Sequence, residues 1–394
     1  MARREEFDAV ILGAGAAGMM CALIAGRRGR RVLLLDHADE PGRKILISGG
    51  GRCNFTNLDV RPERFFSGNP HFCRSALARY TQQDFIALVD RHGIAWHEKT
   101  LGQLFCDGSA RQIVAMLVQE CAEAGVELRL GQHVGTVTRT DRFTVELDAG
   151  EVTASALVLA TGGLSIPKMG ATGLAHDIAR RFGLPVTELR PALVPLVFGA
   201  HDLDVMRPLS GISAEVVASC NGTAFRENLL FTHRGLSGPA ILQASTCWRE
   251  GDPLSIDLLP DADAAAALRA AKRTRPRAAL KTHLADLLPQ RLALALAPEP
   301  LRDRPIGEIA DRDLDTLGAA LDGWRVVPTG SEGYAKAEVT LGGIDTRALS
   351  SKTMEARDTP GLYAIGEAVD VTGWLGGYNF QWAWSSGWCA GQAL

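Results

Sequence analysis

The 394-residue sequence has little net charge, no paired cysteine motif and no long apolar run. Its formal net charge of −3 does not favour a nucleic-acid or anionic-membrane partner for the whole chain, although a local basic patch is not excluded. The eight cysteines are scattered without a CxxC pair, which argues against a disulfide framework or a zinc knuckle. No apolar run reaches about 18 residues, so we expect no membrane-spanning helix. These absences predict a cytoplasmic protein that needs no metal and no membrane.

The composition is that of a folded protein of moderate size. Apolar residues make up 46% of the chain and charged residues 22%, which is enough for a packed core. The length suggests roughly two to three domains. The N-terminal segment has basic residues before an apolar run, as in a signal peptide, but Glu5, Glu6 and Asp8 interrupt that pattern. The same run contains a motif that explains it better.

Gly13, Gly15 and Gly18 form the pattern GxGxxG between an expected strand and an expected helix. The apolar runs before and after this helix are typical of parallel strands covered on both faces. The first glycine permits a tight turn, the second lets a pyrophosphate approach the backbone, and the third lets helix and strand pack closely. Asp36 ends the second strand, 21 residues after Gly15, and can accept hydrogen bonds from a ribose diol. The segment therefore predicts a dinucleotide-binding site.

The rest of the chain predicts one domain that is interrupted and then resumed. After helices within 70–125, the segments VELRLG, GTVTRT, RFTVELDAG and EVTA predict an antiparallel meander, and SALVLATGG predicts another buried strand. This layout is that of glutathione-reductase-type FAD domains, so we expect an α/β fold. The expected parts are a Rossmann FAD domain (1–190 and 335–394), an inserted β-rich domain (191–260 and 324–334) and a small helical insert (261–323).

The C-terminal segment LYAIGEAVD points to a flavin dinucleotide. In flavoproteins of this type, a strand ending in Gly-Asp or Gly-Glu places its carboxylate beside the ribityl chain, the role expected of Glu367. Amides around Gly376 and Gly377, where the last helix begins, would stabilise the anionic reduced flavin at its pyrimidine edge. A glycine-rich turn without a ligand is the alternative. No second GxGxxG follows a strand, so NAD(P)H would dock transiently over a permanently held FAD, or the electrons come from elsewhere.

The sequence resembles the BaiN-like family of FAD-binding flavoproteins, also labelled YhiN-like or aminoacetone-oxidase-like. The resemblance rests on GRKILISGGGRCNFTN, ATGGLSIPKMGATG, FTHRGLSGPA, AEVTLGGI, TMEARDTPGLYAIGEAVDVTGWLGGYN and QWAWSSG. It covers nearly the whole chain and implies an FAD domain with an inserted β-domain and a small helical domain. Members are linked to reduction of carbonyl-conjugated C=C bonds in bile-acid intermediates, to dihydrouridine formation in ribosomal RNA, and to amine oxidation.

The first two of these activities share one chemistry. Reduced flavin N5 gives hydride to the electron-poor carbon of an activated alkene, and a protein acid protonates the other carbon. We therefore expect an NAD(P)H-dependent flavin reductase of a carbonyl-conjugated C=C bond in a small molecule. The same reaction on a ribosomal RNA uridine is the alternative, with a small-amine oxidase and a flavin-binding protein without turnover ranked below it. The sequence does not decide between NADH and NADPH or set the oligomeric state.

The cofactor-binding residues expected from the motifs and the resemblance come from distant segments. The segment GRKILISGGGRCN should run beside the FAD, with Arg43 or Lys44 near the adenosine and diphosphate and its later part near the isoalloxazine ring. The full set is Gly13, Gly15, Ala16, Ala17, Gly18, Asp36, Arg43, Lys44, Gly50, Gly51, Arg52, Cys53, Val134, Thr161, Gly162, Gly163, Gly366, Glu367, Gly376, Gly377, Tyr378 and Asn379.

Cys53 and His233 are the candidate catalytic residues. Cys53 could protonate the substrate carbon, because a thiol near a flavin and a basic group can be poised for proton transfer. It could instead pack inside a tight loop. Cys106 could supply a second thiol, although an ordinary loop residue is the favoured interpretation. His233, Arg234 and Ser237 could face the substrate from the inserted domain, or these polar residues could cap the helix that follows.

One basic segment, AKRTRPRAALK, bears on an RNA substrate. It places five cations in the helical insert: Lys272, Arg273, Arg275, Arg277 and Lys281. They could form a surface that follows phosphates. A solvated helical face is the commoner explanation, and no interleaved aromatic residue offers a platform for base stacking. The segment is compatible with an RNA substrate but does not select it.

Overall fold

The chain forms two compact units in the computed structural model, which describes residues 5–394. Unit 1 runs to Arg190 and resumes at Val339, whereas unit 2, Pro191–Glu338, is continuous. The sequence predicts that the chain leaves the first domain near residue 190 and returns to it near residue 335. One stretch of chain is therefore inserted into a domain that is built from both ends.

Unit 1 is built on a mixed sheet with the order β7-β2-β1-β10-β9-β8. Strand β20 also pairs with β10, along its second half, while β9 pairs with the first half. Strands β1, β2, β7, β10 and β20 run parallel, and every residue of β2 is buried, as expected for a strand covered on both faces. The strands are β1 (Glu5–Leu12), β2 (Val32–Leu35), β7 (Glu127–Arg129), β8 (Val134–Arg139), β9 (Phe143–Leu147), β10 (Gly150–Leu159) and β20 (Leu362–Ala364).

Two details of the expected meander are wrong. The segment VELRLG contributes β7, which pairs parallel with β2 at the edge of the sheet instead of joining the antiparallel strands. The segments EVTA and SALVLATGG belong to one strand, β10, because β1 pairs with it in register from residue 152 to residue 159 without a break. The meander therefore consists of β8, β9 and the first half of β10.

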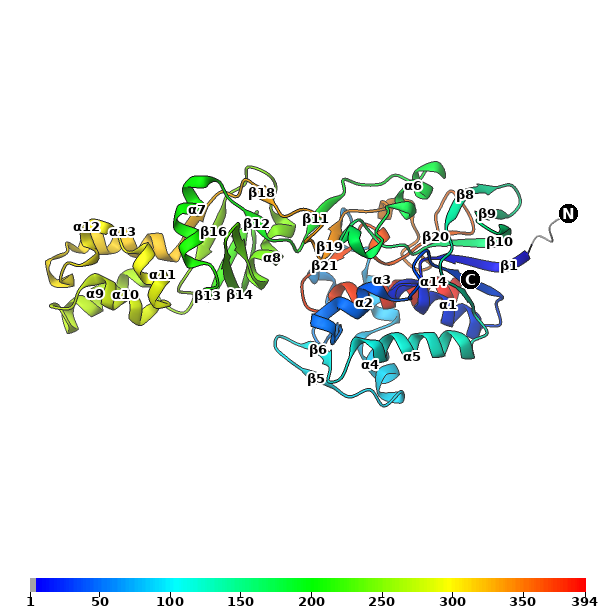
Figure 1. Ribbon diagram of the computed structural model, residues 1–394, viewed down its shortest axis with the longest axis horizontal. Coiled ribbons are helices and arrows are strands. Elements are labelled where there is room, and N and C mark those ends of the chain that lie inside the picture. The colour runs from blue at the N-terminus through cyan, green and yellow to red at the C-terminus, as the bar shows by residue number, and fades with distance from the viewer. Residues whose placement is uncertain (1–4) are drawn as a thin grey trace. The chain divides into compact units, whose positions relative to one another are not determined.

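Helices α1 and α14 lie side by side beneath this sheet (Figure 1). Two glycines of α14 allow the approach, since a Cβ at Gly387 would lie 2.5 Å from the Ala17 carbonyl oxygen and one at Gly391 would lie 2.7 Å from that of Cys21. The ends of unit 1 are thus packed together. Its helices are α1 (Ala16–Arg27), α2 (Arg43–Ile47), α3 (Arg74–Arg79), α4 (Gln82–Arg91), α5 (Ala110–Glu123), α6 (Leu174–Arg181) and α14 (Tyr378–Ala393).

Aromatic packing ties α14 to a small three-stranded sheet of order β3-β6-β5. Trp384 is fully buried and stacks on Phe85 with ring centroids 4.2 Å apart, and its indole N–H donates to the Phe55 carbonyl at 2.9 Å. A buried indole needs such a partner. The short strands are β3 (Asn54–Asn57), β4 (Phe65–Phe66), β5 (Trp96–Glu98), β6 (Gln103–Cys106), β11 (Arg190–Ala192), β19 (Val339–Leu341) and β21 (Thr372–Gly373).

Unit 2 contains an antiparallel sheet of order β17-β16-β13-β14-β15-β12-β18. The connection from β16 to β17 forms a helical bundle (Figure 1), in which α13 packs so closely on α9 that a Cβ at Gly318 would lie 2.4 Å from the Ala265 nitrogen. An α/β Rossmann-type domain with an inserted β-rich domain is therefore confirmed. The strands are β12 (Leu196–Val197), β13 (Ser213–Cys220), β14 (Thr223–Thr232), β15 (Gly235–Ser237), β16 (Leu254–Asp257), β17 (Trp324–Val326) and β18 (Gly330–Ser331). The helices are α7 (Ala200–Met206), α8 (Pro239–Cys247), α9 (Ala264–Thr274), α10 (Leu280–Leu287), α11 (Gln290–Leu296), α12 (Glu299–Arg302) and α13 (Asp311–Asp322).

The start of α8 corrects one expectation. Pro239 occupies the first turn, where its missing N–H costs nothing. Ser237 does not cap this helix, because it is the last residue of β15 and Gly238 occupies the N-cap position without a side-chain bond. Gly238 is required here by its backbone, since a Cβ would lie 2.7 Å from the Asn228 carbonyl oxygen.

Candidate functional site

The first glycine turn of unit 1 is closed on one side and open on the other. Gly13 has a φ of +107°, and a Cβ there would lie 2.5 Å from the Ala160 carbonyl oxygen; one at Gly18 would lie 1.9 Å from the Gly13 carbonyl oxygen. Gly15 caps α1 without a side-chain bond, and a Cβ there would meet nothing within 4 Å. The free N–H groups of the helix, beginning at Ala16 and Ala17, thus face open space suited to a phosphate.

Asp36 lies beside this turn, as a ribose-binding carboxylate should. Its carboxylate accepts the N–H of Ala14 at 2.7 Å and that of Ala38 at 2.9 Å, one on each oxygen. Each oxygen retains a lone pair, so a ribose diol can still bind. The segment before β8 lies against Asp36, because the Gln132 N–H donates to the Asp36 carbonyl at 2.9 Å. Val134, another expected site residue, follows two residues later and begins β8.

Lys44 and Glu367, which are 323 positions apart, form an ion pair at 2.6 Å. Lys44 Nζ also donates to Ser165 Oγ at 2.6 Å, and Ser165 Oγ donates to Glu367 Oε1 at 2.9 Å. The Thr340 N–H donates to the same oxygen at 2.9 Å. Burial alone would raise the pKa of Glu367, but Lys44 and the two other donors outweigh it and hold that pKa below its usual value. The network therefore presents an ionised carboxylate and an ammonium group side by side.

The sequence expectation for this network is incomplete. The sequence predicts Lys44 near the adenosine and diphosphate and Glu367 beside the ribityl chain; the structure brings the two side chains together, and both cofactor roles stay predictions. Ser165 and Thr340 were not among the expected site residues, although both lie inside motifs that carry the family resemblance, ATGGLSIPKMGATG and AEVTLGGI. Gly163 makes room for them, since a Cβ there would lie 2.4 Å from Thr340 Oγ1.

Thr161 and Gly162 connect this network to the glycine turn. The Thr161 hydroxyl accepts the N–H of Ala175 at 3.1 Å and so anchors the start of α6. Gly162 has a φ of +76°, and a Cβ there would lie 3.7 Å from Glu367 Oε2. Gly366, with a φ of +62°, packs against Ala17 of α1. The expected FAD residues of β10 and β20 therefore gather at the carboxyl ends of adjacent parallel strands, where α/β sheets bind ligands.

The glycine run after α2 has a left-handed backbone. Gly49, Gly50 and Gly51 have φ values of +56°, +66° and +85°, which favour glycine. A Cβ at Gly49 would lie 2.7 Å from the Phe105 ring, whereas Gly50 has nothing within 4 Å and Gly51 only a carbonyl oxygen at 3.9 Å. Arg52 is exposed and Arg43 is half-buried. The run packs against the Phe105 ring at Gly49, and its other side, at Gly50, is open to a flat ligand.

Cys53 follows this run and lies in the core. It has a left-handed φ of +55°, which is uncommon outside glycine, and its N–H donates to the Ser48 carbonyl at 3.0 Å. Its side chain is fully buried, and burial raises the pKa of the thiol far above its usual value, with a smaller opposing effect from Ser48. Burial likewise raises the pKa of Cys106 to about 11. Both groups are protonated near neutral pH, and a substrate would reach Cys53 only after the loop moves, so its catalytic role stays a prediction.

The start of α14 is held against β3 and β6. Gly376 and Gly377 have φ values of +110° and +94°, and a Cβ at Gly377 would lie 2.4 Å from the Thr56 carbonyl oxygen. No side chain caps this helix, so its first amides, from Tyr378 onward, retain their N–H groups for a ligand. The Asn379 side chain is already used, because it bonds the Gly373 N–H and carbonyl at 2.8 and 2.9 Å. Asn379 therefore shapes the loop before the helix.

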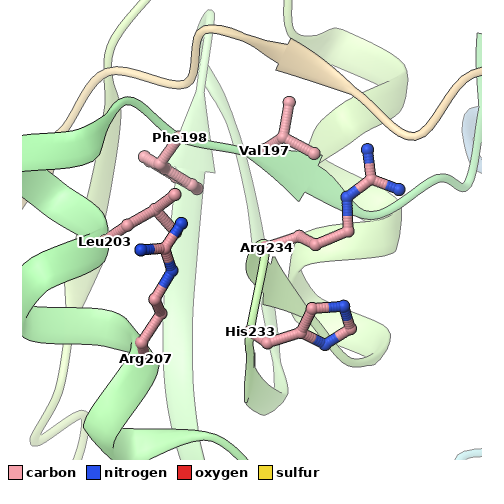
Figure 2. Close-up of a pocket in the computed structure, with 6 residues that line it drawn as sticks. All are labelled: Val197, Phe198, Leu203, Arg207, His233 and Arg234. Atoms are coloured by element: carbon pink, nitrogen blue, oxygen red, sulfur yellow. The ribbon is translucent and has the colours of Figure 1, made fainter.

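His233 belongs to unit 2 and lies on the exposed turn between β14 and β15. Figure 2 shows it beside Arg234, across a surface pocket from Arg207. Apolar side chains of Val197, Phe198 and Leu203 complete the lining. The catalytic role expected of His233 stays a prediction.

The basic segment of the helical insert is mostly neutralised. Three of its cations form ion pairs with aspartates of other segments: Lys272 with Asp311 at 2.7 Å, Arg275 with Asp286, and Lys281 with Asp303 at 2.5 Å. Only Arg273 and Arg277 are exposed without an acidic partner among the described residues. This pairing supports a solvated helical face over a phosphate-tracking surface.

Neither a membrane span nor a metal cluster occurs in the part of the chain that the structure describes. None of the helices within 5–394 is both long and apolar enough to cross a bilayer. No group of three or more His, Cys, Asp or Glu side chains in this range could hold a metal ion. The open glycine turns, the uncapped starts of α1 and α14, and Asp36 instead fit a dinucleotide such as FAD.

Comparisons with known proteins agree with this geometry. Residues 7–393 match the model of the HI0933-like protein Rossmann domain family. The "Ribosomal RNA dihydrouridine synthase" of Escherichia coli (strain K12) is 56% identical over 99% of this chain and 98% of its own, and that of Haemophilus influenzae is 47% identical over 98% of each. The "3-dehydro-bile acid delta(4,6)-reductase" of Clostridium scindens is 28% identical over 97% of this chain and 98% of its own.

Among solved structures, the fold resembles those of two enzymes. A 3-ketosteroid-Δ4-(5α)-dehydrogenase from Rhodococcus jostii aligns with a TM-score of 0.50 and 16% identity over 99% of this chain and 98% of its own. An open flavocytochrome c3 fumarate reductase aligns with a TM-score of 0.50 and 17% identity over 99% of this chain and 78% of its own. At this identity the likeness shows the fold alone. The chain belongs to the HI0933-like (BaiN/YhiN) family of FAD-binding Rossmann proteins and is a flavin-dependent reductase.

Proposed function

We propose that the protein reduces a uridine of ribosomal RNA to dihydrouridine. The observation that carries this proposal is the 56% identity, over 99% of the chain, to the Escherichia coli protein of that name, against 28% to the bile-acid reductase. The sequence alone favours a small-molecule substrate, with RNA as the alternative. The comparisons favour the alternative, because two relatives above 40% identity carry the RNA activity in their names.

The residues of unit 1 suit this reaction. When bound and reduced, FAD supplies hydride to the electron-poor carbon of the uracil C=C bond. The open turn at Gly15 and the start of α1 bind the diphosphate, and Asp36 binds the ribose of the adenosine. The Lys44–Glu367 pair offers a fixed donor and a fixed acceptor to the polar chain of the cofactor. The uncapped start of α14 would hold the flavin at its pyrimidine edge and supply partial positive charge to its anionic reduced form.

A protein group has to protonate the second carbon of the reduced bond. We keep Cys53 as the proposed donor because it directly follows the open glycine run, although burial raises the pKa of its thiol and makes it a weaker acid. Its complete burial means that proton transfer requires movement of the segment from Gly49 onward. The electrons are proposed to come from NAD(P)H, which docks transiently.

The test starts with the purified protein, mixed anaerobically with NADH or NADPH while the flavin absorbance is followed. Bleaching identifies the donor. The reduced protein is then incubated with ribosomal RNA that lacks dihydrouridine, and digested nucleosides are analysed by mass spectrometry. A gain of two hydrogens on uridine supports the proposal. Fast oxidation by a conjugated steroid enone, with no change in the RNA, would instead support the small-molecule reductase.

A further inference from the structure

The surface pocket of unit 2 gathers basic groups from two separate elements. Arg207 begins the 3-10 turn that continues α7, whereas His233 and Arg234 lie on the turn from β14 to β15 (Figure 2). The cavity has a volume of about 590 Å³, ample for one phosphate group and several waters. We infer that this pocket binds a backbone phosphate of the RNA substrate, an inference that rests on the proposed function.

The two guanidinium groups of this pocket differ in their acidic partners. The Arg207 guanidinium has no acidic partner among the described residues. Arg234 forms an ion pair with Glu332 at 3.5 Å, but its side chain is 56% exposed and its other N–H donors stay free. The acids of α7, Asp202 and Asp204, do not line the pocket. Guanidinium groups with free donors are therefore available to an anion.

A third arginine of unit 2 lies next to this pocket. Arg291 of α11 donates to the carbonyl of Pro208, the residue that follows Arg207. Aspartates neutralise three of the five cations in the basic segment of the helical insert, and Glu332 neutralises one of the two guanidinium groups of the pocket. The pocket is distinguished by its shape, because its basic groups line a cavity of about 590 Å³.

The chemistry of the lining favours a phosphate over a base. Two arginine forks and an imidazole N–H match the oxygens of a phosphodiester, and arginine is the preferred residue for such bidentate contacts. The ring of Phe198 is buried, so the pocket offers a base only the small imidazole ring of His233 for stacking. The contact would therefore be independent of sequence and would position the RNA. A substrate as long as ribosomal RNA can touch unit 2 while one of its nucleotides is held by unit 1.

The same chemistry could hold a phosphate of NADPH, so the experiment measures both ligands. The test variant is R207A/R234A in the full-length, FAD-loaded protein. The matched control is R312A/R325A, which removes two exposed arginines of unit 2 that do not line the pocket. The variant R207K/R234K keeps the charge and tests rescue. Flavin absorbance and thermal melting establish that each variant is folded.

Binding of a fluorescently labelled ribosomal RNA fragment is measured by anisotropy between about 50 and 200 mM salt, and KM is measured for RNA and for NADPH. We expect R207A/R234A to raise KM for RNA about tenfold at low salt, with kcat nearly unchanged. The slope of log K against log salt should fall by about 0.7 for each lost contact to single-stranded RNA. R207K/R234K should recover most of that slope, and the control should match the wild type.

The outcomes separate this inference from the proposed function. If the wild type forms dihydrouridine and R207A/R234A keeps the same KM and salt slope, the pocket does not bind RNA and the proposed function stands. If R207A/R234A raises only KM for NADPH, the pocket serves the reductant and the inference is overturned. If the wild type neither binds nor modifies ribosomal RNA, the proposed function fails and the inference falls with it.

Discussion

Replacing Lys44 with methionine tests the network that connects the two ends of unit 1. The change removes the ion pair to Glu367 and the bond to Ser165, both at 2.6 Å. Breaking a buried pair costs about 3–5 kcal/mol, whereas an exposed pair contributes about 0–1 kcal/mol. The side chains of Lys44 and Glu367 are 33% and 18% exposed, so we expect a loss between these limits, about 2–3 kcal/mol.

The loss should depend on pH, with a sign that follows from Glu367. In the wild type its pKa is lowered, so its contribution to stability is present above the unfolded pKa and is lost as the pH falls through the folded value. Without Lys44, burial is opposed only by the donors Ser165 and Thr340, and the pKa of Glu367 rises. As acid protonates this carboxyl in the variant, the free energy of unfolding of the variant rises relative to that of the wild type. The difference between the two proteins should therefore be larger at pH 8 than near pH 5.

A double-mutant cycle isolates the pair. K44M, E367Q and K44M/E367Q are compared by urea unfolding with two probes, FAD release and tryptophan fluorescence, because two units need not unfold together. The double variant should be less destabilised than the sum of the single variants, by about 1–2 kcal/mol. Additive losses, or a K44M protein that keeps wild-type stability and FAD retention, would refute the reasoning.

Other positions give predictions of different kinds. Gly18→Ala should abolish FAD retention, because its Cβ would lie 1.9 Å from a backbone oxygen, whereas Gly15→Ala should fold and only weaken FAD binding; an absorbance spectrum after gel filtration separates them. C53A should leave flavin reduction by NAD(P)H unchanged but slow reoxidation by RNA, as measured by stopped flow; equal reoxidation rates would exclude Cys53 as the proton donor. Native Cys53 should resist thiol reagents near neutral pH, because its pKa is raised. Trp384→Ala should cost about 3–5 kcal/mol in urea unfolding, since the ring is fully buried.

The local turns of the site could be predicted from the sequence because short-range sterics determine them. Gly13 and Gly18 are required by backbone oxygens within a few residues or on the adjoining strand, and Asp36 ends the strand that pairs next to them. Such short-range steric constraints are visible in the sequence as a fixed spacing between glycines and the acidic residue that follows them. The left-handed run Gly49–Gly51 is visible in the same way, as three consecutive glycines.

The missed features depend on contacts between distant segments. Thr340 joins the Lys44 network only because the returning chain meets the loop after β10, where the N–H groups of Leu164 and Ser165 donate to its hydroxyl, and nothing near Thr340 in the sequence marks a donor. The sequence of β7 resembles part of a meander, but in the fold this strand pairs with the free edge of β2. The basic segment looks continuous, yet aspartates such as Asp311 neutralise it from other helices. The residues around Cys53 are those of a reactive site, but its side chain is buried in the core. Only the packing of the folded chain shows this burial.

The close packing of α14 on α1 has a consequence for synthesis on the ribosome. Unit 2 is continuous, so it can fold as soon as residue 338 has left the exit tunnel. Unit 1 at that moment lacks β20, Thr340, Glu367 and the helix that covers α1. At about 5–20 residues per second, the N-terminal strands wait tens of seconds for these parts. The inserted unit is thus finished before the unit that surrounds it, and the proposed FAD site is complete only after the last helix has been made.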